Sequence, residues 1–424
     1  MNISEIRKDP AYRQWLSDQS FPEIDTEQVR ALISNDLKTG SNLTQFNYTL
    51  WRKWHLLNEK YSANDSETLK HIDRIKDNIW LPSMPEDFLE LDPEVIYVNQ
   101  SFPVRRVSIW GSERFMFLSN PDRLSKDWTT LGDFLSTGNP TAGNVGRTLR
   151  FLVRDKKTKK YLGLLALSGD YLDLPGRDQF IGWSRDLRGN GKMIEHTAAG
   201  SVIVPTQPFG FNYLGGKLLS LLLASDPVRE AWEDIYEKRL VGISTTSLYG
   251  GENSSSQYDG LKPYWRNLGL TAGSSTLRPC PSSEIQMREW MRIKHPEKYW
   301  ELLVATRATG MPLVRYPLEK VRTFCYQKLG IPQSLYKSAH QRGTYFCSLY
   351  RRTPEFLRGE ISEKNLGAKR FDSSIESLVE RWKMKYAVKR LNSLLKQGRV
   401  SNEIGFYDEL LTLSWDQTLR QFGQ

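Results

Sequence analysis

Residues 198–273 decide the fold, because no other part of the chain alternates so regularly between strand and helix patterns. The stretch begins with AAGSVIVPTQP (198–208), an apolar run that ends at prolines, and continues with FNYLGGKLLSLLLASDPVREAWEDIYEKR (211–239), a long helical pattern. LVGISTTSLYGG (240–251) predicts a second strand, and QYDGLKPYWRNLGLTAG (257–273) a short aromatic helix followed by a turn. Parallel strands joined through a helix need both sheet faces covered, so we expect this unit at the buried centre of an α/β protein.

The composition is that of a soluble globular chain with an anionic partner. Of its 424 residues, 39% are hydrophobic and 25% are charged, and the net charge of +10 favours association with anions. A chain of this length usually holds two or three domains. Three cysteines without a CxxC pair predict a reduced, cytoplasmic setting. We find no signal-peptide pattern and no apolar run that is long enough to span a membrane.

Patterns outside the central stretch divide the chain into three regions. Residues 1–90 carry helical patterns, one of which Asp25 is placed to cap. Residues 91–283 are β-rich before the central stretch and contain a clear hairpin with the arms RTLRFLVRD and YLGLLALSG. Residues 284–424 are helical and basic. We therefore expect an α/β core with a mixed sheet over 91–283, flanked by an N-terminal and a C-terminal helical region.

The C-terminal region has a composition typical of nucleic-acid binding. Between residues 320 and 399 the chain carries 18 Lys and Arg against six Asp and Glu, a larger net charge than that of the whole chain. Basic residues with interleaved aromatics are typical of DNA and RNA contacts, although a basic surface over an aromatic core is an equal alternative. The aromatic residues are Tyr326, Tyr336, Tyr345, Phe346, Tyr350 and Phe356, and the candidate DNA contacts are Arg351, Arg352, Lys383 and Lys385.

A second candidate for DNA binding precedes the first core strand. In GRDQFIGWSRDLRGNGK (176–192), Arg185, Arg188 and Lys192 lie among glycines, and loops of this kind often hold phosphate or the DNA backbone. The alternative is a solvated loop whose charges contact nothing specific. His196 follows this loop and is a candidate catalytic group, although a lone histidine is more often structural.

No short motif identifies a reaction. The chain has no zinc spacing, no HExxH, no GxSxG and no Walker A loop. A hydroxyl-rich loop, TTSLYGGENSSSQYD (245–259), follows the second core strand at its carboxyl end, where open α/β sheets bind ligands. Ser247 and Tyr258 are candidate catalytic groups there. We expect Lys217 and Arg188 to face the same pocket; the alternative is a polar connecting loop and a solvent-exposed Lys217.

The central stretch resembles known families. Its order of strand, helix, strand and YWRNLGL is similar to the GNAT acyltransferase core, in which one strand splays from its neighbour and a helix N-terminus binds the coenzyme A pyrophosphate. The nearer resemblance is to the DruA family, named for the Druantia anti-phage system and also found in phage genomes. The phage Mom DNA-modification proteins are similar in the same unit. The matching positions are Gly182–Trp183, Arg188, Leu218–Leu219, and Tyr258 through Gly273 in the signature YxxxxxxWxxLGxTxG.

The GNAT resemblance implies a GNAT-like mixed sheet and an acyl-coenzyme A-like donor held by Asn212, Gly215, Gly216 and Lys217. Asn212 stands where the GNAT pattern has Gln or Arg, and Lys217 stands where it has Gly or Ala. A glycine at a helix N-terminus lets the backbone approach a phosphate, and Lys217 adds a positive charge. Because fold alone does not give function, the ligand stays open at this point.

Charge and resemblance together predict a DNA-interacting protein of phage–host conflict, with DNA and other defence-system or phage proteins as partners. Two alternatives stay open. One is a Mom-like acyltransferase that modifies DNA bases, which a tunnel between the core strands would favour. The other is a nuclease or strand-transfer protein, which a carboxylate cluster near a basic groove would favour.

Overall fold

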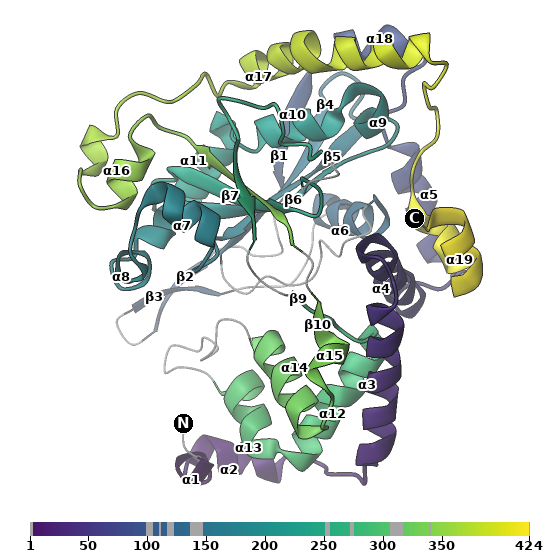
Figure 1. Ribbon diagram of the computed structural model, residues 1–424, viewed down its shortest axis with the longest axis vertical. Coiled ribbons are helices and arrows are strands. Elements are labelled where there is room, and N and C mark those ends of the chain that lie inside the picture. Colours follow the sequence, from purple (N-terminus) through teal and green to yellow (C-terminus); the bar gives the residue numbers. More distant parts are fainter. Residues whose placement is uncertain are drawn as a thin grey trace. The chain divides into compact units, whose positions relative to one another are not determined.

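The computed structural model describes residues 3–98, 105–109, 112–116, 123–135, 147–250, 255–271, 275–305, 317–338 and 341–423. The chain forms two compact units, each built from segments that are far apart in the sequence (Figure 1). Unit 1 comprises Met1–Asn64, Gly273–His340 and Leu410–Gln424; unit 2 comprises Asp65–Ala272 and Gln341–Glu409. The sequence, by contrast, predicted three consecutive regions.

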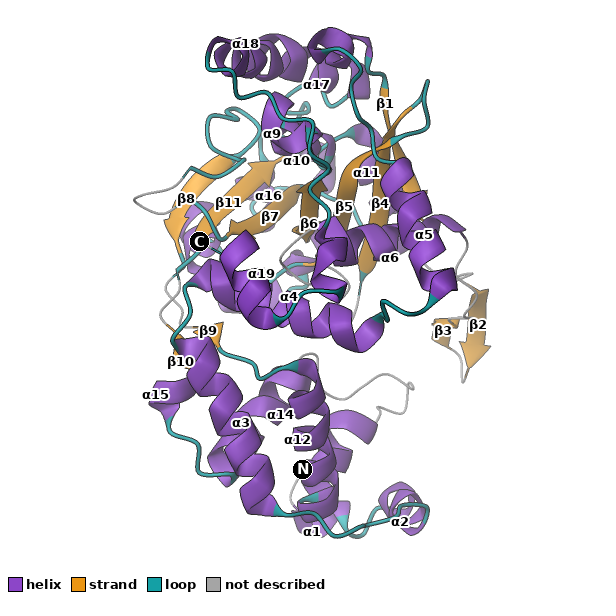
Figure 2. Cartoon of the chain, turned by 90° about the vertical axis from the view of Figure 1, so that its right-hand side faces the viewer, coloured by secondary structure: helices purple, strands orange, loops and turns teal. Residues whose placement is uncertain are grey.

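Unit 2 is built on a seven-stranded mixed sheet, which confirms the expected α/β class. The strand order is β1-β4-β5-β6-β7-β11-β8, and only the β6–β7 pair is parallel (Figure 2). The strands are β1 (Pro93–Val98), β4 (Thr148–Asp155), β5 (Tyr161–Gly169), β6 (Thr197–Pro205), β7 (Gly242–Ser247), β8 (Arg266–Leu270) and β11 (Gly343–Ser348). A separate antiparallel pair joins β2 (Arg105–Ile109) to β3 (Ser112–Met116).

Helices pack on the sheet and on one another. The helix α10 packs against β5 and β6, and α17 packs against α10 in turn, while α6 packs against β1, β4 and β5. The principal helices of unit 2 are α5 (Ser66–Asp77), α6 (Arg123–Leu135), α7 (Pro175–Ile181), α8 (Arg185–Gly189), α9 (Phe209–Tyr213), α10 (Gly215–Leu222), α11 (Asp226–Tyr236), α16 (Thr353–Leu357), α17 (Ile375–Trp382) and α18 (Val388–Lys396). Shorter helical turns are η1 (Pro85–Glu90), η2 (Met193–His196), η4 (Glu363–Asn365) and the π-helical η5 (Lys383–Ala387), which joins α17 to α18.

Apolar periodicity explains how these elements bury their faces. Leu218, Leu219, Leu222 and Leu223 are all fully buried, as their helical spacing predicts. Along β4 the alternate residues Leu149, Phe151 and Val153 join the main core, whereas the Arg150 guanidinium between them lies over the ring of Trp128 in α6. Alternate side chains of a strand point to opposite faces, so both faces of this hairpin are covered.

Three expectations from the sequence need correction. The predicted single helix over residues 211–239 is divided into α9, α10 and α11, because Leu214 adopts a left-handed conformation and Pro227 sits in the first turn of α11. The predicted aromatic helix at YWRNLGL is absent from these described residues: Tyr264 and Trp265 lie in a turn segment, and Arg266–Leu270 form strand β8. The C-terminal region, predicted to be helical, also supplies the wholly buried strand β11, which lies between β7 and β8. Pairing with distant strands overrides local propensity at both places.

Unit 1 is helical. Its core clusters Val29, Ile33, Met287, Cys325 and Tyr326, which come from α3, α12 and α14. The predicted cap by Asp25 is confirmed, and Pro296 begins a new helix directly after α12. The elements are α1 (Ile3–Ile6), α2 (Pro10–Ser17), α3 (Thr26–Ser41), α4 (Gln45–Lys60), α12 (Pro281–Lys294), α13 (Pro296–Tyr299), η3 (Trp300–Val304), α14 (Pro317–Lys328), α15 (Gln333–Tyr336), α19 (Trp415–Phe422) and the pair β9 (Ser275–Thr276) and β10 (Lys337–Ser338), with η6 (Tyr407–Leu411) before α19. Among the described helices of the whole chain, none has the length and apolarity needed to cross a bilayer.

Replacement of Leu222 by Asp tests the packing of α10. Leu222 is fully buried, so the variant places an unpaired carboxylate in the core and should lower the free energy of unfolding by about 4 kcal/mol or more. Leu395 in α18 is 45% exposed and provides the matched control, L395D, whose unfolding midpoint should stay close to that of the unmodified chain. Equal urea-unfolding midpoints for L222D and L395D would contradict the assignment of α10 to the core.

Candidate functional site at the carboxyl ends of β6 and β7

The parallel strands β6 and β7 are paired only near their amino ends. The register joins Thr197 to Gly242, Ala198 to Ile243 and Ala199 to Ser244, and no pairing continues toward the carboxyl ends at Pro205 and Ser247. At the point of parting, the Thr245 hydroxyl donates to the carbonyl oxygen of Gly200 at 2.8 Å. The backbone of β6 beyond this point therefore needs other partners on the β7 side.

Side chains from the turn before β8 supply those partners. The Gln257 amide donates to the carbonyl oxygen of Ile203 at 3.2 Å and to the Tyr258 hydroxyl at 3.1 Å. The same hydroxyl lies 3.5 Å from the Thr245 hydroxyl on β7. Tyr258 is buried, and burial raises the pKa of its phenol, so the group is neutral at ordinary pH. A bridge of side chains thus joins the two strands where their backbones part.

The side chain of Lys217 in α10 holds this turn in place. Its ammonium donates to the carbonyl oxygens of Gln257 and Asp259. Burial lowers the pKa of Lys217, and the Asp259 carboxylate acts in the opposite direction. That carboxylate accepts from the Tyr345 hydroxyl at 2.9 Å, and burial together with Asp259 raises the pKa of Tyr345 to about 12. An amine, a carboxylate and two phenols therefore lie within one hydrogen-bonded cluster, a set of groups able to donate and accept protons.

The predicted cofactor residues lie next to this cluster. Asn212 is fully buried, and its amide donates to the carbonyl oxygen of Ser401 at 2.6 Å and accepts from the Ser401 N–H at 3.0 Å. A Cβ on Gly216 would lie 2.3 Å from Oε1 of Gln257, and one on Gly215 would lie 2.4 Å from the Phe209 ring. These glycines let protein side chains approach closely, and their role toward a cofactor stays a prediction.

Of the three predicted catalytic candidates, the structure brings only two to this end of the sheet. Ser247 ends β7, and its hydroxyl accepts from the Tyr249 N–H at 3.1 Å, while Tyr258 lies inside the cluster. His196 precedes β6 and so lies at the opposite end of that strand, where its Nδ1 lies 2.9 Å from the Arg239 carbonyl oxygen. Burial lowers the pKa of His196. Residues 251–254 of the hydroxyl-rich loop lie outside the described residues.

The segment of the glycine-flanked arginines, predicted as a loop, instead forms the short helices α7 and α8, and a buried ion-pair network holds it. Nη1 of Arg177 lies 2.9 Å from Asp170, and both side chains are fully buried. Asp170 also accepts from the Ser244 hydroxyl on β7 at 2.9 Å. Asp178 accepts from Arg177 and from the Trp183 indole. Arg188 is buried as well, and it donates to the carbonyl oxygens of Leu172 and Trp183 and to Asp173. This network holds Arg188, and none of its contacts is with Lys217 or Tyr258.

The predicted DNA contacts differ in how exposed and how well paired they are. Lys192 and Arg351 are exposed, and neither side chain makes an ion pair with a described residue. Arg185 lies 3.2 Å from Asp173, and Arg352 lies 3.9 Å from Glu355. The six aromatic residues named as candidates in the basic segment are buried and so unavailable for stacking on bases. The alternative of an aromatic core under a basic surface describes these six residues.

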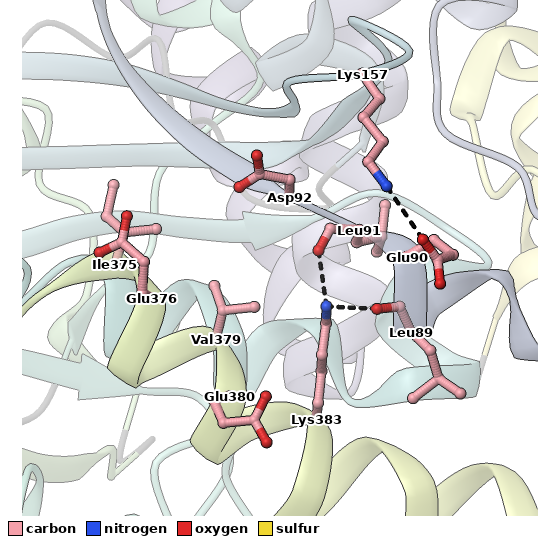
Figure 3. Close-up of a pocket in the computed structure, with 10 residues that line it drawn as sticks. All are labelled: Leu89, Glu90, Leu91, Asp92, Lys157, Ile375, Glu376, Val379, Glu380 and Lys383. Carbon is pink, nitrogen blue, oxygen red and sulfur yellow. Dashed lines mark hydrogen bonds and ion pairs between the residues drawn. The ribbon is translucent and has the colours of Figure 1, made fainter.

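Lys383 lines a surface pocket of about 330 Å³ in unit 2 (Figure 3). Its ammonium donates to the carbonyl oxygens of Leu89 at 2.6 Å and Leu91 at 2.8 Å. The charged lining residues are Glu90, Asp92, Glu376, Glu380, Lys157 and Lys383, so carboxylates outnumber cations. An acidic lining repels phosphate, and the pocket therefore does not suit a nucleic-acid backbone.

Sequence reasoning named Lys385 as a candidate DNA contact but overlooked Lys389 and Lys396, which continue a row of lysines that begins there. Lys385, Lys389 and Lys396 are exposed and lie four and seven residues apart along η5 and α18, a spacing that places them on one helix face. None of the three makes an ion pair or a hydrogen bond with a described residue. The row of lysines could have been predicted from the helical periodicity of SSIESLVERWKMKYAVKRLNSLLKQG. We call these three residues the lysine stripe.

Comparisons with known proteins match the chain to one family and to one curated relative. The family described as Druantia protein DruA matches residues 136–359, which is just over half of the chain. The Druantia protein DruA of Escherichia coli (strain UMEA 4076-1) is 28% identical over 231 residues, which are 47% of this chain and 55% of that protein. The chain thus spans about half the length of this curated relative. No solved structure matches the chain.

The network around Arg177 predicts a large loss of stability on replacement of Asp170. D170A removes the only fully buried carboxylate that pairs with the fully buried Arg177 guanidinium among the described residues and leaves it with Asp178 alone, so the free energy of unfolding should fall by about 3–5 kcal/mol. D186A, at an exposed carboxylate of the same loop, is the matched control and should cost less than about 1 kcal/mol. Urea unfolding compares the two variants. If D170A proves as stable as D186A, the ion-pair network does not hold the arginines of this segment, and they are free for another role.

Proposed function

This chain belongs to the DruA family, and on that premise we propose that it is a DNA-interacting component of an anti-phage defence system. The matching residues contain β4 to β11 and hence most of the unit 2 sheet. The name of the Escherichia coli relative assigns that protein to the Druantia system, and the same setting is proposed for this chain. Other proteins of the system are its proposed partners besides DNA.

The observation that carries the DNA proposal is the lysine stripe. Residues 381–402 contain seven Lys and Arg and no Asp or Glu. One face of the helix is buried through Trp382, Tyr386, Leu391 and Leu394, so the helix is held in the fold and the stripe faces outward. From the first to the last lysine the stripe extends about 16 Å, at about 1.5 Å per residue.

Such a stripe fits a phosphate backbone. Lysines without carboxylate partners neutralise phosphates and release the counterions that surround a nucleic acid. Phosphate contacts position a protein on DNA but do not read the bases. Because the aromatic residues of the same region are buried, we propose salt-sensitive binding with little preference for sequence.

Charge reversal of the stripe tests this proposal. The K385E/K389E/K396E variant should bind labelled duplex DNA much more weakly, and its slope of log affinity against log salt should be shallower by roughly 2 to 3, at about 0.9 for each lost phosphate contact. Fluorescence anisotropy over a salt series measures both quantities. Circular dichroism should show an unchanged fold, because the three side chains are exposed.

A matched control separates the stripe from net charge. K70E/K126E/K364E reverses three exposed lysines in α5, α6 and η4 of unit 2, outside the lysine stripe, and it lowers the net charge equally. This variant should keep most of the DNA affinity and the original salt slope. An equal loss in both variants would reject the stripe as the binding surface, and no binding by the unmodified chain at low salt would reject DNA binding.

The parting of β6 from β7 supports a second candidate, a Mom-like acyltransferase with a GNAT-like core. A splayed pair of strands is what the GNAT resemblance requires, and Lys217 and Tyr258 lie at the splay. Calorimetric titration of the chain with acetyl-coenzyme A should then give saturable binding. The K217A/Y258F variant should not bind, whereas the control K262A, at an exposed lysine, should bind like the unmodified chain. If titration of the unmodified chain gives no heat, the acyltransferase candidate is rejected. The side-chain bridge of Gln257 and Tyr258 would then fill the space between the strands that an acyl donor needs.

A further inference from the structure

Unit 1 contains a cluster of three side chains with the chemistry of transition-metal ligands. His55 and Glu59 lie on α4, and Cys280 directly precedes α12. One ligand atom from each residue, an imidazole nitrogen, a carboxylate oxygen and the thiol sulfur, lies within 4.8 Å of the other two. Within the described residues, this is the one group of three or more His, Cys, Asp or Glu side chains that converges in this way.

The surrounding structure fixes all three residues in place. His55 and Glu59 are four residues apart on a helix, so they share one face. The Cys280 N–H donates to a carboxylate oxygen of Asp36 in α3 at 2.8 Å, and the Ser282 N–H donates to the Glu59 carboxylate at 2.9 Å. The segment before α12 is thus tied by its backbone to both α3 and α4. The convergence of the ligand atoms therefore follows from backbone contacts as well as from side-chain rotamers.

The imidazole of His55 has no hydrogen-bond partner among the described residues. Its ring lies edge-on to the rings of Trp51 and Trp54, with centroid distances of 4.8 and 4.9 Å. A half-buried histidine that packs between two indoles and has no hydrogen-bond partner in the described part of the chain has a nitrogen available for a ligand.

We propose that His55, Glu59 and Cys280 bind a Zn²⁺ ion, with the Asp36 carboxylate beside Cys280 as the fourth ligand. Thiolate and imidazole together select zinc over Mg²⁺ and Ca²⁺, which prefer oxygen ligands. Zinc bonds of about 2.0–2.3 Å in a tetrahedron place ligand atoms about 3.5 Å apart, so the atoms of these three residues, which lie within 4.8 Å of one another, would have to approach by about 1.3 Å at most.

The neighbours of the cluster are compatible with a cation. The Ser282 and Ser283 hydroxyls lie 3.3 and 2.9 Å from the Cys280 sulfur and suit hydrogen bonds to a thiolate. Arg52, the nearby positive charge on α4, donates to the Pro279 carbonyl oxygen and lies 3.9 Å from Glu284. Two carboxylates and a thiolate give the ligand set three negative charges, which more than offset the charge of Zn²⁺. The proton of the Cys280 thiol passes to solvent when the metal binds.

A bound ion would join three helices of unit 1 that are distant in the sequence. Asp36 is on α3, His55 and Glu59 are on α4, and Cys280 leads into α12. A ligand that binds only the folded state raises the free energy of unfolding. At high ligand concentration, the gain grows with the logarithm of the ligand concentration divided by the dissociation constant. The site is therefore structural, and it does not depend on the function proposed for unit 2.

Metal analysis of the full chain tests the proposal. Protein purified without an affinity tag or chelator should contain about one zinc per chain, and cobalt added to the chelator-treated chain should give the visible d–d bands and near-ultraviolet thiolate charge transfer of a tetrahedral site. C280S should lose the zinc and the charge-transfer band. C325S, which removes a buried thiol of the same unit without ligand groups around it, should keep both.

A second pair of variants guards against loss of the fold. Glu59 is exposed, so E59Q should remain folded by circular dichroism yet bind zinc at least tenfold more weakly in competition with a chromophoric chelator. E27Q, at an exposed glutamate on α3, should bind like the unmodified chain. The proposal is overturned if the unmodified chain takes up neither zinc nor cobalt, or if folded C280S and E59Q bind zinc as tightly as C325S and E27Q.

Discussion

The short parallel pairing of β6 and β7 constrains the rest of unit 2. Three residue pairs hold the strands together, and beyond Ala199 and Ser244 their backbones part. Backbone groups inside a protein need hydrogen-bond partners, so the turn before β8 must lie close enough for Gln257 to reach the Ile203 carbonyl oxygen. Lys217 holds that turn through two carbonyl oxygens. The candidate site is thus the set of groups that satisfies the parted strands.

The sequence predicts those features that depend on local periodicity and local caps. The burial of Leu222 and its neighbours, the β4–β5 hairpin and the Ser374 cap of α17 all follow from patterns within a few residues. Strand β11 was not predicted, because its six residues lie among basic residues and its place between β7 and β8 is set by partners about 75 to 100 residues away. The same non-local pairing turned the expected aromatic helix into β8.

Charge was visible in the sequence, but the state of each charged side chain was not. Arg188 belongs to the motif that carries the family resemblance, yet it is buried against Asp173 and two carbonyl oxygens. Lys383 lies among carboxylates, whereas Lys389 and Lys396 on the following turns make no ion pair with a described residue. Which cations are available to a partner depends on where the carboxylates of distant elements fall. The distinction between paired and unpaired lysines therefore carries the functional argument, and net charge alone does not.

Differential lysine labelling tests most directly whether the lysine stripe is the DNA-binding surface. The unmodified chain is treated with an amine-reactive reagent in the presence and absence of duplex DNA, and the modified lysines are quantified by mass spectrometry. Labelling of Lys385, Lys389 and Lys396 should fall when DNA is bound, while that of the equally exposed Lys70, Lys126 and Lys364 should not change. DNA-bound protein in which the stripe is labelled as fast as the other lysines would contradict the account.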